Sequence, residues 1–194
     1  MMMETFLAIL IGIGLSASAG FRIFTPLLLT SIATKLSWVT LADGFDWISS
    51  TPALIAFSIA LIVEIASYYI PVIDNFVKVI ATPFAVVAGM LLTASFIGDM
   101  DPFLSWGIAI IAGGGTASVT QLTSTAIRGT STVVTGGIGN FFVSIFEGIS
   151  AFVIAVGTIL VPFLAIVFVG IIIILFVIFI LRRRRRKVQQ GLVG

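Results

Sequence analysis

Four charged residues lie inside otherwise apolar stretches of this sequence: Arg22, Glu64, Arg128 and Glu147. An ionised side chain at the centre of a bilayer costs about 2.5–3.5 kcal/mol on insertion scales, and such residues usually face the interior of a helix bundle. We therefore expect the four charges to be paired, hydrated or neutralised by proton uptake. Because a carboxylate can hold a proton or a cation and a guanidinium can hold an anion, these residues are candidates to line the path of an ion, a small solute or a lipid headgroup.

Helical spacing places further polar side chains beside the two carboxylates. Tyr68 lies four residues after Glu64, on the same helix face. Asn140 and Ser144 precede Glu147 by seven and three residues, which also puts them on one face. We therefore add Tyr68, Asn140 and Ser144 to the candidate ligand path.

Two stretches of small residues could contribute backbone N–H groups to the same site. Ser16-Ala17-Ser18-Ala19-Gly20 precedes Arg22, and Gly113-Gly114-Gly115 interrupts a second apolar segment. An arginine beside N–H groups at the start of a helix forms a good cradle for an anion. The cradle candidates are Ser16, Ser18, Gly20, Gly113, Gly114, Gly115, Thr116 and Ser118.

A structural alternative explains the same residues. Arg–Glu pairs can fix helix packing, while glycine, serine and threonine allow helices to approach closely and to bond to each other. Ten of the twenty residues from 116 to 135 are serine or threonine, and this density favours a ligand path over packing alone. Two functions remain open: a small transporter or channel-like protein, and a non-catalytic membrane scaffold or assembly factor.

The residue types absent from the chain limit its chemistry. The sequence has no cysteine and no histidine, which removes disulfides, thiolate and imidazole metal sites, and every Ser-His or Cys-His catalytic arrangement. Only a Glu–Glu acid/base pair or an arginine-assisted reaction could support catalysis. We therefore expect no enzyme, no metal site and no cofactor.

The composition is that of an integral membrane protein. Hydrophobic residues make up 59% of the 194 residues and charged residues 9%, against about 25% charged in a soluble domain. The run Arg182 to Lys187 holds six of the ten basic residues, so the remaining chain has four basic and eight acidic residues and a net charge of −4. The basic tail thus indicates orientation, with a cytoplasmic C-terminus at the cell inner membrane, and gives no reason to expect nucleic-acid binding.

The apolar segments predict an all-α, polytopic helix bundle. A membrane-spanning helix needs roughly 20 apolar residues, and segments 52–70, 76–97, 140–161 and 163–181 fit that length. Segments 5–36 and 103–135 are longer. The first is interrupted at 16–20 and again at Pro26, and the second at 113–115. Because non-helical backbone at membrane depth needs protein or a water-filled cavity around it, these two are either broken spans or re-entrant hairpins.

The two interrupted segments also resemble each other, since Leu10–Ser18 aligns with Ile110–Ser118 one hundred residues later. This predicts one transmembrane domain, residues 1–181, built from two three-segment repeats at about 5–98 and 103–181, followed by a basic cytoplasmic tail, 182–194. If both interrupted segments cross, there are six spans and the repeat is inverted. If both are re-entrant, there are four spans and the repeat is parallel. We favour six segments, and a homo-oligomer in the lipid bilayer is compatible with either arrangement.

Several of these stretches together resemble one known family. The motifs are Gly14-Leu15-Ser16-Ala17-Ser18-Ala19-Gly20-Phe21-Arg22 with Pro26, Glu64 with Tyr68-Tyr69-Ile70-Pro71 and Asp74-Asn75, Ala81-Thr82-Pro83 with Ala85-Val86-Val87-Ala88-Gly89, Ala112-Gly113-Gly114-Gly115, Arg128-Gly129-Thr130-Ser131-Thr132 and Gly136-Gly137-Ile138-Gly139-Asn140. Together they resemble the bacterial membrane-protein family catalogued as domain of unknown function 4126, over roughly residues 8–165. The resemblance implies an inner membrane protein and supplies no activity.

Overall fold

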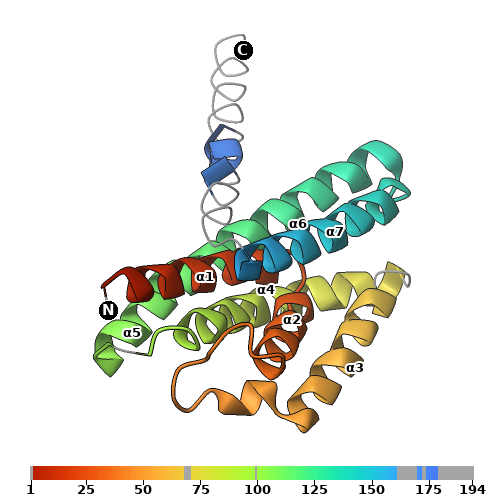
Figure 1. Ribbon diagram of the computed structural model, residues 1–194. Coiled ribbons are helices and arrows are strands. Elements are labelled where there is room, and N and C mark those ends of the chain that lie inside the picture. The colour runs from red at the N-terminus through yellow and green to blue at the C-terminus, as the bar shows by residue number, and fades with distance from the viewer. Residues whose placement is uncertain (1, 68–70, 99, 161–169, 172–173, 179–194) are drawn as a thin grey trace.

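A computed structural model describes residues 2–67, 71–98, 100–160, 170–171 and 174–178 of the chain (Figure 1). Within these ranges the regular structure is entirely helical. The elements are α1 (Met2–Phe21), α2 (Phe24–Lys35), the 3-10 helix η1 (Asp46–Ser49), α3 (Thr51–Ser67), α4 (Pro71–Ala94), α5 (Pro102–Ile108), the π-helix η2 (Ala109–Gly114), α6 (Gly115–Thr135) and α7 (Gly139–Leu160). The all-α prediction is therefore confirmed for the described residues.

Three helices of the described chain are long and apolar enough to cross a membrane: Glu4–Phe21, Pro102–Thr135 and Gly139–Leu160. Two shorter apolar helices, Thr51–Ser67 and Ala81–Ala94, accompany them. The helices thus have the length and composition of a membrane protein. The predicted count of six segments is not confirmed, and most of segment 163–181 and all of the tail 182–194 lie outside the described residues.

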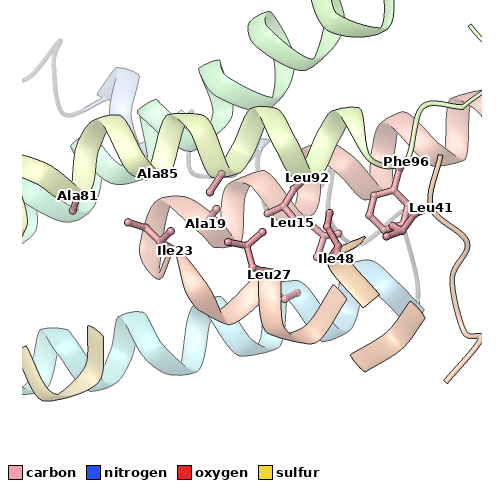
Figure 2. Close-up of a cluster of buried hydrophobic side chains, with 12 residues drawn as sticks. Leu15, Ala19, Ile23, Leu27, Leu41, Ile48, Ala81, Ala85, Leu92 and Phe96 are labelled. Carbon is pink, nitrogen blue, oxygen red and sulfur yellow. The ribbon is translucent and has the colours of Figure 1, made fainter. Parts of the chain in front are cut away.

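Helix α1 is the centre of the bundle, since it packs against α4, α6 and α7 (Figure 1). The apolar core continues from α1 into α2 and across to α4, as Figure 2 shows for Leu15, Leu27 and Leu92. Alanines such as Ala19 and Ala85, both with no exposed surface, bring the helix axes close together. Helix α3 lies at the edge of the bundle beside α2, and only three of its side chains are buried: Ala53, Glu64 and Ser67.

Segment 103–135 is not interrupted, which contradicts the prediction of a broken or re-entrant segment. Residues 102–135 form one helical stretch in which Ala109–Gly114 widens to a π-helix. Gly113 faces α4, where an added Cβ would lie 2.5 Å from the Gly89 carbonyl oxygen. Gly113 and Gly89 therefore allow a close contact between this helix and α4. The π-turn accommodates the local change in helix geometry without ending the helix.

Segment 5–36 is broken once, between the two predicted interruptions at residues 16–20 and at Pro26. Residues 16–20 are helical and buried within α1, and the chain leaves the helix at Arg22–Ile23. Pro26 lies in the first turn of α2, where its missing N–H costs no helical hydrogen bond. Because only the first of the two aligned segments is broken, the predicted repeat is not confirmed.

The remaining segments match the predicted boundaries more closely. Helix α7 occupies residues 139–160 where 140–161 was expected, and α3 occupies 51–67 where 52–70 was expected. Helix α4 occupies residues 71–94 where 76–97 was expected, so it begins five residues earlier, at Pro71. Gly136, with φ of 64°, ends α6 in the left-handed conformation that favours glycine.

Candidate functional site

The break between α1 and α2 leaves two backbone N–H groups without a carbonyl partner in the helix. The carboxylate of Glu64, on α3, accepts a hydrogen bond from each of them. The Ile23 and Phe24 N–H groups donate to the two carboxylate oxygens at 2.9 and 3.2 Å. In a continuous helix these groups would bond to carbonyls one turn earlier, but at the start of a new helix they have no such partner. A carboxylate also interacts favourably with the positive end of a helix. Glu64, 7% exposed, therefore fixes the position of the break.

Arg22 directly follows the last residue of α1, and its side chain extends to α7. Its guanidinium donates to the Ser144 carbonyl oxygen at 2.9 Å and to the Ser144 hydroxyl at 2.8 Å. Its side chain is buried, with 5% of the residue exposed. Arg22 is also close enough to interact electrostatically with Glu64. We call Arg22, the Ile23 and Phe24 N–H groups, Glu64 and Ser144 the break site.

Two cavities flank the break site, one on each side of α3. A cavity of about 370 Å³ lies between α3 and α7 and includes Arg22 and Ser144 in its lining. A second cavity, of about 580 Å³, lies between α3 and α4 and includes Glu64 and Ser67. The guanidinium and the carboxylate of the break site thus line different cavities. Any displacement of α3 changes both.

A second buried charge pair joins α6 to α7. Arg128 and Glu147 form a bidentate ion pair, in which Nε donates to one carboxylate oxygen at 2.9 Å and Nη2 donates to the other. The Ser124 hydroxyl also donates to Glu147. Arg128 is 4% and Glu147 2% exposed. We call the ion pair of Arg128 and Glu147, with the Ser124 hydroxyl that donates to it, the α6–α7 pair.

The structure brings together some of the predicted path residues and separates others. Arg22, Glu64 and Ser144 meet at the break site, and Glu147 is close enough to interact electrostatically with Glu64. Asn140 lies apart, where its amide donates to the Thr132 hydroxyl at 2.8 Å. Tyr68 lies outside the described residues.

Two features of the site were not predicted: the backbone N–H groups that donate to Glu64, and Thr25 in the lining of the smaller cavity. The predicted interruption at Pro26 lies close to the break, and the preference of proline for the start of a helix could have placed it more accurately. A helix that includes Pro26 in its first turn begins near residue 24.

Five of the predicted backbone cradle residues contact a neighbouring helix: Ser16, Ser18, Gly20, Gly113 and Gly114. Ser118 donates to the Gly114 carbonyl oxygen of its own helical stretch, and nothing lies within 4 Å of a Cβ added at Gly115. The Ser16 hydroxyl contacts the Gly89 carbonyl oxygen of α4 at 2.7 Å, and the Ser18 hydroxyl donates to the Ala151 carbonyl oxygen of α7 at 2.7 Å. Gly20 faces α6, where an added Cβ would lie 2.6 Å from the Ala117 carbonyl oxygen. The backbone of these residues is helical, so the structure favours the packing alternative for them.

The hydroxyl groups of α6 also have local partners. Seven of the serine and threonine side chains donate to the carbonyl oxygen four residues earlier. Such bonds satisfy a hydroxyl within its own helix. The hydroxyl density of residues 116–135, which favoured a ligand path at the level of sequence, is therefore explained without a ligand.

No group of three or more Cys, His, Asp or Glu side chains that could hold a metal ion occurs among the described residues. Comparison with protein families gives a match to the model described as "Domain of unknown function (DUF4126)" over residues 9–183. The chain therefore belongs to this family. Neither the curated proteins nor the solved structures gave a match to the chain.

Proposed function

We propose that this DUF4126 protein is a small membrane transporter that moves an anionic solute together with a proton. Arg22 would hold the anion and Glu64 the proton. The observation that carries the proposal is the position of a buried guanidinium in the wall of a cavity, with a buried carboxylate within electrostatic range and in the wall of a second cavity. Binding sites are concave, largely apolar and equipped with a few convergent polar groups.

The chemistry of the break site suggests how proton and anion are coupled. An ionised Glu64 occupies the N–H groups of Ile23 and Phe24 and offsets the charge of Arg22. When Glu64 takes up a proton, it becomes a weaker acceptor and no longer offsets the guanidinium. An anion entering beside Arg22 restores the charge balance, so the two species enter the site together at a low cost in buried charge.

Helix α3 is the element we expect to move. It carries Glu64, lines both cavities, and buries only Ala53 and Ser67 besides that carboxylate. Because a helix with few buried side chains has few packing contacts to lose, its displacement is cheaper than that of α1. The hydrogen bonds between Glu64 and the N-terminus of α2 would then hold α3 in the position that the structure shows.

A scaffold or assembly function without transport is the second candidate. The α6–α7 pair and the hydroxyl and glycine contacts of α1 favour it, because they join neighbouring helices to each other. In this case Glu64 would only stabilise the break, and removing its charge would lower the folded yield without affecting any flux. Neither candidate involves catalysis. Under both, we place the protein in the inner membrane with the basic tail, 182–194, in the cytoplasm.

The test is proton uptake into liposomes that contain the purified protein and an internal pH-sensitive dye. Chloride, inorganic phosphate, succinate and dodecyl phosphate are added outside in turn, at a fixed inward proton gradient. We expect at least one anion to drive protein-dependent uptake, and Glu64→Gln to abolish it. Lys35→Gln is the matched control, because Lys35 is exposed and bonds to Thr51 outside the break site.

Arg22 provides a second arm of the same experiment. Arg22→Lys keeps the positive charge and should retain part of the uptake, whereas Arg22→Gln should lose it. An uptake that is equal in wild type, Glu64→Gln and Arg22→Gln would overturn the proposed function. Uptake that no anion drives above protein-free liposomes would overturn it as well.

A further inference from the structure

We propose that the cavity between α3 and α7 binds a single-chain anionic lipid, with the headgroup at Arg22 and Ser144 and the alkyl chain along the apolar walls. This inference names the substrate class for the proposed function and rests on that function for the coupling to protons. The binding itself can be tested separately from transport.

The polar end of the cavity has the groups that an anionic headgroup needs. Arg22, Thr25 and Ser144 are each at least nine-tenths buried and contribute to the cavity wall. A guanidinium is a planar donor that matches a carboxylate or a phosphate. Gly148 stands beside it, where an added Cβ would lie 3.7 Å from an Arg22 nitrogen, so this side of the guanidinium is lined by a residue without a side chain.

The other walls of the cavity are apolar and partly exposed at the protein surface. Ile149 is 59% and Phe152 53% exposed, on a helix with the length and hydropathy of a membrane span. An alkyl chain would contact these walls as well as the polar end of the cavity, whereas a small hydrophilic anion at Arg22 would contact only the polar end. The apolar lining residues are Leu61, Ile65, Phe141, Ile145, Ile149 and Phe152.

The size of the cavity favours one chain over two. Its volume of about 370 Å³ is near the lower limit of ligand sites, which range from about 300 to 1,000 Å³. The larger cavity on the α4 side is a poor alternative, because its buried charged group is the Glu64 carboxylate. An anionic headgroup there would be repelled unless Glu64 were protonated.

The test is equilibrium binding of radiolabelled dodecyl phosphate to the full-length protein in nanodiscs of phosphatidylcholine, with binding to empty nanodiscs subtracted. We expect saturable binding that Arg22→Gln weakens about tenfold or more, because a charge-assisted contact is lost. Arg22→Lys should weaken it less. Dodecyltrimethylammonium, which has the same chain and the opposite charge, should not compete, and inorganic phosphate should compete only weakly because it lacks the chain.

A cavity-filling substitution separates the cavity from the general surface. Ile149→Trp should block binding, because the added ring occupies the cavity wall. Val153→Trp is the matched control: Val153 is 51% exposed on the same helix and is not part of the cavity wall. Both sites face outward, so we expect both variants to fold, and thermal unfolding of each checks this.

The possible outcomes distinguish this inference from the proposed function. Equal binding by wild type, Arg22→Gln and Ile149→Trp overturns the lipid site. Competition by inorganic phosphate as strong as that by unlabelled dodecyl phosphate overturns the alkyl-chain requirement. If small anions drive proton uptake and dodecyl phosphate does not bind, the transport proposal stands and this inference fails. If dodecyl phosphate binds in the cavity and no anion drives uptake, the reverse holds.

Discussion

The break site and the α6–α7 pair both bury one arginine and one glutamate, yet they use these residues differently. In the α6–α7 pair, Arg128 and Glu147 satisfy each other directly, with Ser124 as a further donor. In the break site, Glu64 accepts from backbone N–H groups and Arg22 donates to α7. In a direct pair each charge depends on the other, whereas charges that bond to groups on several helices beside two cavities can exchange partners. Burial of a charge therefore does not by itself indicate a functional residue.

The largest effect is expected from breaking the α6–α7 pair. Glu147→Ala leaves Arg128 buried without its carboxylate, which should lower the free energy of unfolding by about 3–5 kcal/mol. Thermal or denaturant unfolding of the purified protein in detergent measures this loss. The double variant Arg128→Met/Glu147→Leu removes both charges and should recover most of the stability. Equal stability of wild type and the single variant would contradict a structural role for the pair.

A smaller loss of stability is expected at the break site. Glu64→Gln keeps an oxygen that can accept one N–H bond, so it should cost about 1–3 kcal/mol, mainly from the weakened second bond and the lost interaction with Arg22. Hydrogen exchange of the Ile23 and Phe24 amides is the local readout, and it should accelerate in this variant while exchange in α6 does not change. A loss as large as that of Glu147→Ala would make the two regions equivalent.

The smallest effects come from the serines that accompany each arginine. Ser144→Ala removes the hydroxyl that accepts from Arg22 and leaves the Ser144 carbonyl in place, so we expect a loss of about 0.5–1.5 kcal/mol in the free energy of unfolding. Ser124→Ala removes a donor to Glu147, at a similar cost. The two variants should differ in transport, since Ser144 lines the cavity between α3 and α7 and Ser124 is not part of its lining. Identical uptake by both would remove Ser144 from the site.

Part of this architecture could be predicted from the sequence, because hydropathy and local turn chemistry determine it. The membrane class, the ends of α7 and the burial of all four charges follow from apolar length and from the cost of an ionised group in a bilayer. The glycine run 113–115 led to a wrong prediction, because a glycine can serve either a break or a close helix contact. Only the position of α4 beside Gly113 distinguishes the two.

The pairing of the charges could not be predicted for the same reason. Glu64 accepts from the backbone N–H groups of Ile23 and Phe24, which follow Arg22, whereas residues 128 and 147 are joined through their side chains. Sequence spacing contains no information on which helices become neighbours after folding. The break site therefore depends on tertiary packing. The sequence could identify Arg22, Glu64 and Ser144 as candidate residues but not the groups to which they bond.

The most direct test of the account compares proton uptake by two reconstituted variants, each normalised to the amount of folded protein. Glu64→Gln alters the break site, and Arg128→Met/Glu147→Leu replaces the α6–α7 pair with apolar side chains. The account predicts that Glu64→Gln abolishes anion-driven uptake while the double variant retains most of it. Retained uptake in Glu64→Gln, or an equal loss in the double variant at wild-type folded yield, would contradict it.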